Sequence, residues 1–100
     1  MADACLFVLN HVQAPDLYDQ GVTHLNVGSG KDISIAALAD AIKDVVGFKG
    51  AIEYDTDKPD GTPRKLLDVS RLTKLGWQPK IDLQEGIAAT YEWYLRERAV

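Results

Sequence analysis

The chain has 100 residues, of which 46% are hydrophobic and 26% charged, and its formal net charge is −4. This length and mixture fit one small domain with a core and exclude a disordered tail. They also exclude an enzyme that holds both a dinucleotide and a sugar substrate within this chain, because such enzymes need roughly two or three times this length.

Charge and cysteine content narrow the functional classes further. An acidic chain is not expected to bind nucleic acid, because nucleic-acid binding depends on many basic contacts to phosphates. The single cysteine, Cys5, cannot form an internal disulfide, so a reducing, cytoplasmic location is expected. The longest apolar run, residues 4–9, is far too short to span a bilayer. We therefore expect neither a nucleic-acid nor a membrane role.

The first part of the chain predicts one helix and one strand. Apolar residues recur at spacings of three and four from Cys5 to Val12, which predicts a helix that stops before Pro15 and keeps Cys5 in the core. Because this pattern begins almost at the first residue, it favours a segment of a longer protein. After a polar loop, residues 24–27 predict a short strand that ends in the turn Gly28-Ser29-Gly30.

The middle of the chain carries the clearest helix signals. Ser34 is the expected N-cap and Gly47 the expected left-handed residue after the helix. Between them lies one apolar stripe, formed by Ile35, Leu38, Ile42, Val45 and Val46. Residues 51–54 alternate like a half-buried strand, and residues 57–63 are rich in turn-forming residues.

Two further helices are predicted in the last third of the chain. Residues 66–69 are expected to be extended, and Ser70 is expected to cap a short helix that reaches Leu75. The final helix opens with a capping box at Asp82 and Glu85. Its expected inward residues are Leu83, Ile87, Tyr91 and Leu95, and its closing cations are Arg96 and Arg98. Trp77 and Trp93 are interpreted as packing anchors.

These elements predict an α/β fold, in detail a mixed α+β arrangement of about four helices and two or three short strands. Residues 1–100 are predicted to form a single domain, since no linker or internal repeat interrupts them.

Two short motifs favour structural over chemical interpretations. Gly28-Ser29-Gly30 resembles a phosphate loop, but Ile33 stands where a third glycine is required, so an ordinary turn is favoured. Tyr54 and Lys58 have the spacing of a catalytic Tyr-x-x-x-Lys pair, which works from one face of a helix. Here Lys58 precedes Pro59, where the helical conformation is disfavoured, so a catalytic role is not expected.

No metal site is expected, because the two histidines and the cysteine lack the spacing of zinc ligands.

Basic residues gather in residues 58–80, where six Lys or Arg residues accompany two Asp residues, so this stretch is +4 and the remainder is −8. A lysine there is suited to a diphosphate, and a carboxylate to hydroxyls or base amines. The two prolines of the stretch 58–65 reduce the entropy lost when a ligand orders it. A solvated basic surface remains the alternative interpretation.

Residues 58–68, Lys-Pro-Asp-Gly-Thr-Pro-Arg-Lys-Leu-Leu-Asp, closely resemble the signature of the GDP-L-fucose synthase family, in the extended short-chain dehydrogenase superfamily. Residues 25–30 and the final helix are also similar to segments of that family. Leu75-Gly76-Trp77 is shared more widely, across nucleotide-sugar epimerases and dehydratases. The resemblance runs through essentially the whole chain.

The resemblance implies the C-terminal substrate-binding region of an NADP-dependent enzyme that epimerises and reduces GDP-4-keto-6-deoxymannose, with the Rossmann core absent. Within that region it implies that Asp60 and Lys65 contact the GDP-sugar, with Arg64 as a further candidate that braces the loop. It assigns no catalytic, cofactor-binding or metal-binding residue to this chain, because the family's NADP loop and catalytic residues precede the matched region.

Three hypotheses follow from the resemblance. The chain is the GDP-sugar-binding part of such an enzyme and inactive alone, or a free-standing nucleotide-sugar-binding or interaction module, or a fragment of a related nucleotide-sugar epimerase or dehydratase. NADP(H) belongs to the parent family rather than to this chain. Apolar surface left by the missing Rossmann domain is expected to favour self-association.

Overall fold

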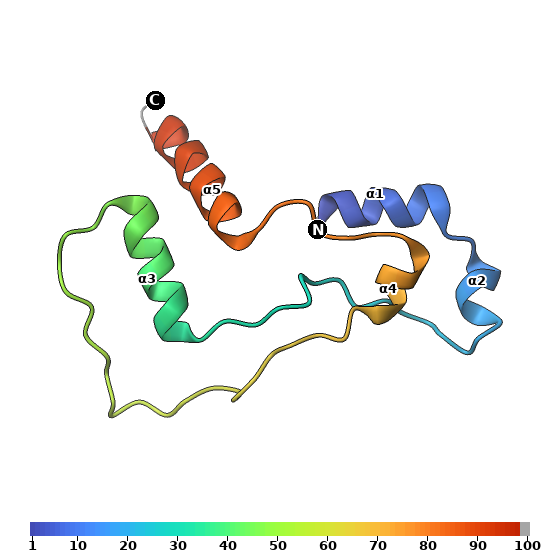
Figure 1. Cartoon of the computed structure of the whole chain (residues 1–100), viewed down its shortest axis with the longest axis horizontal. Coiled ribbons are helices and arrows are strands. Elements are labelled where there is room, and N and C mark those ends of the chain that lie inside the picture. The colour runs from blue at the N-terminus through green and yellow to red at the C-terminus, as the bar shows by residue number, and fades with distance from the viewer. Residues whose placement is uncertain (99–100) are drawn as a thin grey trace. The chain divides into compact units, whose positions relative to one another are not determined.

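The computed structural model describes residues 1–98 and places five helices along them. They are α1 (Ala2–His11), α2 (Ala14–Tyr18), α3 (Ile35–Val46), α4 (Ser70–Leu75) and α5 (Leu83–Arg98) (Figure 1). The chain divides into two compact units. Unit 1 joins Met1–Asp32 to Lys65–Lys80, and unit 2 joins Ile33–Arg64 to Ile81–Val100.

Unit 1 has a small hydrophobic core between α1, α4 and the turn after α4. Ala4, Leu72 and Trp77 are buried there, and Leu72 is only 1% exposed. Half-buried apolar side chains pack around these three residues; they are Phe7, Val8, Leu25 and Val27. Gly76 makes the turn possible, because it adopts φ +107° at the end of α4.

A polar contact ties the start of α1 to the end of the core. The indole Nε1 of Trp77 donates a 2.9 Å hydrogen bond to Oδ2 of Asp3. Nζ of Lys80 lies 3.4 Å from the same oxygen. The Trp77 hydrogen bond, assisted by the Lys80 charge, lowers the pKa of the Asp3 carboxyl below its ordinary value of 3.8. Trp77 is thus an anchor, as predicted, and its polar edge is satisfied.

Helix α2 was not predicted, because the segment around Pro15 reads as a loop. The structure shows a capping box in which the backbone N–H of Gln13 donates to Asp16 at 2.8 Å. Pro15 stands in the first turn, where its missing N–H has no helical partner to lose. The signal was present in the sequence as Gln13 and Asp16 at capping-box spacing, with proline between them.

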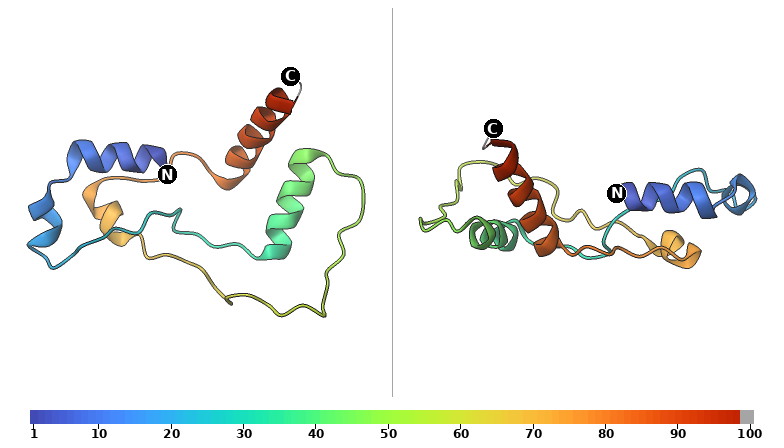
Figure 2. Two further views of the ribbon diagram at one scale, coloured as in Figure 1. Left: turned by 180° about the vertical axis from the view of Figure 1, so that it is seen from behind. Right: turned by 90° about the horizontal axis from the view of Figure 1, so that it is seen from above.

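Unit 2 is built around the helices α3 and α5, which lie side by side (Figure 2). The predicted caps of α3 are confirmed: the Ser34 hydroxyl accepts the Ala37 N–H at 3.0 Å, and Gly47 adopts φ +71°. Asp82 accepts the Glu85 N–H at 2.8 Å at the start of α5. Arg96 and Arg98 stand in the last turn of α5, as expected.

The two or three strands predicted at residues 24–27, 51–54 and 66–69 are not formed, since residues 1–98 contain no strand. Strands need a ladder partner, and in the described residues no backbone hydrogen bond joins these segments to one another. The α/β class is therefore not confirmed, and the structure is mostly helical. The single-domain prediction for residues 1–100 stays a prediction.

Several local predictions are wrong in detail. Cys5 is exposed rather than in the core, because Ala4 is the residue of α1 that faces Leu72 and Trp77. Ser70 is the first residue of α4 rather than its cap, and its N–H is instead satisfied by Asp68 Oδ1 at 3.0 Å. Trp93 is half exposed and buries less than an anchor would.

No helix in residues 1–98 is long and apolar enough to cross a membrane.

Candidate functional site

The loop at residues 55–65 carries the residues predicted to bind a nucleotide. It begins with a turn in which Asp55 accepts two backbone hydrogen bonds, at 3.1 Å from the Asp57 N–H and at 3.4 Å from the Lys58 N–H. The rest of the loop runs as an open trace with exposed side chains (Figure 1). An exposed loop with two prolines and one acidic turn can present charge to a ligand without a large ordering cost.

The three predicted site residues belong to this loop but not to one unit. Asp60 and Arg64 lie in unit 2, and Lys65 is the first residue of the second segment of unit 1. All three side chains are exposed. Their chemistry is complementary to a nucleoside diphosphate, since two cations suit the diphosphate and one carboxylate suits the N–H or O–H donors of base and ribose.

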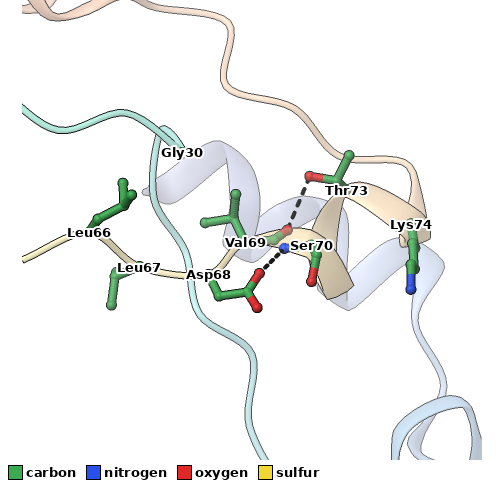
Figure 3. Close-up of a pocket in the computed structure, with 8 residues that line it drawn as sticks. All are labelled: Gly30, Leu66, Leu67, Asp68, Val69, Ser70, Thr73 and Lys74. Carbon is green, nitrogen blue, oxygen red and sulfur yellow. Dashed lines mark hydrogen bonds between the residues drawn. The ribbon is translucent and has the colours of Figure 1, made fainter.

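An open groove follows the loop within unit 1 and was not predicted. It has a volume of about 610 Å³ (Figure 3). Its lining consists of Gly30, Leu66, Leu67, Asp68, Val69, Ser70, Thr73 and Lys74. The only sequence signal for the groove is the apolar content of residues 66–69, which predicted a strand there. Because Lys65 directly precedes Leu66, the loop leads into the groove.

Asp68 organises the end of the groove at which α4 begins (Figure 3). Its carboxylate accepts the Ser70 N–H, and this hydrogen bond is the main reason why the pKa of Asp68 lies below its ordinary value. The charges of Arg71 and Lys74 lower it further. The Asp68 carboxylate therefore stays ionised and offsets part of the positive charge of α4, which leaves Lys65 as the basic group at the loop side of the groove.

The Gly28-Ser29-Gly30 turn has a packing role. A Cβ at Gly28 would lie 3.5 Å from the side chains of Leu67 and Val69, and a Cβ at Gly30 would lie 3.3 Å from Val69. The glycines thus allow residues 28–30 to approach residues 67–69 closely. This contact supports the interpretation as an ordinary turn.

The residues of this chain do not fit a dinucleotide. The glycines that a phosphate cradle would need are packed against Leu67 and Val69. Tyr54 and Lys58 lie outside the five helices, so they do not share the helical face that a catalytic pair requires. We therefore derive no step that passes through NADP(H) on this chain.

Solved structures define the class of protein to which the chain is similar. It is 37% identical to a GDP-6-OMe-4-keto-L-xylo-heptose reductase of Campylobacter jejuni, with a TM-score of 0.87 over 96% of this chain and 28% of that one. It is 35% identical to a GDP-D-glycero-L-gluco-heptose synthase of Campylobacter jejuni, crystallised in the presence of NADPH, with a TM-score of 0.81 over 94% of this chain and 27% of that one. The chain is thus related to enzymes of GDP-linked sugars.

Within that class, the chain is 50% identical over 96 residues to GDP-L-fucose synthase 1 of Arabidopsis thaliana. The match covers 96% of this chain and 28% of the relative. The resemblance predicted from the sequence is confirmed: the chain is homologous to a segment of the GDP-L-fucose synthases and spans little more than a quarter of their length. No family model matches the chain.

Proposed function

We propose that this chain is the GDP-sugar-binding part of a GDP-L-fucose synthase, and that it grips the GDP moiety with Asp60, Arg64 and Lys65. One observation carries the proposal. The relatives are named for different sugars, fucose and two heptoses, but all of them are named for GDP-linked sugars. A segment that is similar in all of them is therefore best suited to the shared nucleotide.

The geometry supports a division of labour in this site. Lys65 and Arg64 are adjacent cations that would neutralise the diphosphate, and Lys65 stands at the mouth of the apolar groove. Asp60, between the two prolines of the loop, would accept hydrogen bonds from N–H groups of the base or from ribose hydroxyls. Such contacts position a substrate for chemistry that other residues perform.

The proposal includes the activity of the isolated chain. Because the residues present do not fit a dinucleotide, this chain alone is expected to bind a GDP-sugar without reducing it. NADP(H) would be held by a different part of the enzyme. We place the protein in the cytoplasm, in keeping with its single exposed cysteine.

Calorimetric titration of the folded chain with GDP tests this proposal. We expect weak binding that Lys65→Ala reduces by about three- to tenfold, since a charge-assisted contact at an exposed site is lost. Raising the salt concentration is expected to weaken binding further. Lys49→Ala, which removes an exposed lysine outside the loop, is the matched control and is expected to leave the affinity unchanged.

Two results would contradict the proposal. The first is no heat at millimolar GDP on a chain whose circular dichroism shows that it is folded. The second is equal weakening by Lys65→Ala and Lys49→Ala, which would indicate general charge attraction. An affinity for UDP equal to that for GDP would favour the fragment of a related nucleotide-sugar epimerase or dehydratase instead.

A further inference from the structure

The backbone of residues 66–68 has no ladder partner. In the described part of the chain, no backbone-to-backbone hydrogen bond joins these residues to another segment. The contact from residues 24–27 is made by a side chain, since Asn26 Nδ2 donates to the Asp68 carbonyl at 3.2 Å. The sequence nevertheless predicts a strand here, so the segment has strand character without the hydrogen bonds of a sheet.

Residues 66–68 are flanked differently on their two sides. On one side, residues 28–30 are packed against Leu67 and Val69 through glycines. The segment also lines the open groove of about 610 Å³, together with Thr73 and Lys74 of α4 (Figure 3). Leu66 and Leu67 are large apolar side chains and remain 42% and 48% exposed. An apolar groove beside unpaired backbone is the arrangement that binds an added strand.

We propose that residues 66–68 are a docking edge for a strand from a second polypeptide, one that corresponds to the part of GDP-L-fucose synthases that this chain does not cover. The length of the relatives supports this occupant. The Arabidopsis relative matches this chain over 28% of its own length, so 72% of a homologous enzyme lies outside the match. The backbone of this chain is also similar to a solved relative at a TM-score of 0.87. Its shape therefore suits association with such a polypeptide.

A second copy of this chain fits the edge less well. If two copies paired antiparallel about a two-fold axis within residues 66–69, Asp68 would lie opposite Leu66, opposite Leu67 or opposite the other Asp68. A carboxylate across from leucine gains little, and two carboxylates across from each other repel. A strand with apolar residues opposite the leucines and a donor opposite Asp68 avoids both penalties.

Co-expression tests the docking edge. This full chain is produced together with Arabidopsis thaliana GDP-L-fucose synthase 1 from which the homologous segment has been deleted, so that each can fold against the other. We expect the two polypeptides to copurify. Amide hydrogen exchange of residues 66–68 should be at least tenfold slower in the complex than in this chain alone. No nucleotide is added, so the result is independent of whether the chain binds GDP.

A matched pair of variants locates the contact. Leu66→Glu places a charge in the groove, and Leu9→Glu makes the same change at a side chain of α1 that is 78% exposed. We expect Leu66→Glu to weaken the complex at least tenfold and Leu9→Glu to change it less than twofold.

Four outcomes would overturn the proposal: failure to copurify, unchanged exchange of residues 66–68 in the complex, equal weakening by the two variants, or a dimer of this chain alone that protects residues 66–68.

Discussion

The two units reach their structure by different means. All four buried side chains of the described residues lie in unit 1, where Ala4, Leu72 and Trp77 meet between segments distant in sequence. Unit 2 has no buried side chain in its described residues, and its helices are defined by local caps at Ser34, Gly47 and Asp82. Caps determine where a helix begins and ends, but a packed core is what makes a unit stable.

This difference also separates the two candidate sites. The groove of unit 1 is held by the packed helix α4 and by Gly28 and Gly30, so its shape depends on the core. Asp60 and Arg64 lie in the open loop of unit 2, where prolines and one turn limit the backbone. Changes in the core are thus expected to alter the groove first, and the loop least.

The largest effect is expected from the core of unit 1. Leu72→Ala removes a side chain that is 1% exposed and leaves a cavity, which should lower the free energy of unfolding by roughly 2–5 kcal/mol. Leu95→Ala makes the same truncation in unit 2 at a half-exposed side chain and should cost less than about 1 kcal/mol. Urea denaturation followed by circular dichroism measures both. Equal losses would show that unit 2 contributes a core of its own.

A smaller effect is expected where residues 28–30 approach the groove. Gly30→Ala forces a side chain into φ +77° and places its Cβ 3.3 Å from Val69, which should cost about 1–2 kcal/mol. Gly61→Ala in the open loop is the control, because nothing lies near its Cβ and its φ is not in the left-handed region. Thermal melts of the two variants should therefore shift differently. A Gly30→Ala variant as stable as the parent would refute the packing role of the turn.

These contrasts explain how much could be predicted from the sequence. Ser34, Gly47 and Asp82 act on neighbours three or four residues away, so the bounds of α3 and the start of α5 could be predicted from local pattern alone. The strands could not, because a strand exists only with a partner, and residues 24–27 and 66–68 find none in the described chain.

The same reasoning applies to the site. Asp60, Arg64 and Lys65 were predicted from a contiguous motif, and their assignment stays a proposal. The groove brings together Gly30 and Thr73, which are distant in sequence, so no local pattern could reveal it. Cys5 shows the related difficulty in a helix: periodicity placed it on the apolar face, but only the packing of Leu72 decides that its neighbour Ala4 is buried.

The next effect concerns a cap of unit 2. Ser34→Ala removes the hydroxyl that accepts the Ala37 N–H, which should lower the stability of α3 by about 1 kcal/mol. Ser34→Asp keeps an acceptor at the same place and adds a favourable charge at the helix start, so it should restore the loss. Hydrogen exchange of the first turn of α3 reports the effect directly. If Ser34→Asp exchanged as fast as Ser34→Ala, the cap would not be what defines the start of α3.

The smallest effect is expected at the contact between Asp3 and Trp77. Because the indole hydrogen bond lowers the pKa of Asp3 in the folded state, the ionised carboxylate stabilises the fold above the ordinary value of 3.8, and that stability is lost as the pH falls through the lowered pKa. In a Trp93→Phe background, Trp77 is the remaining tryptophan, so its fluorescence reports the core of unit 1 alone. Between pH 5 and pH 2 we expect the urea midpoint to fall, and Asp3→Asn should flatten part of that fall. Should Asp3→Asn leave the pH profile unchanged, the contact would pack the start of α1 without adding pH-dependent stability, and the core of unit 1 would depend on Ala4 and Leu72 rather than on charge.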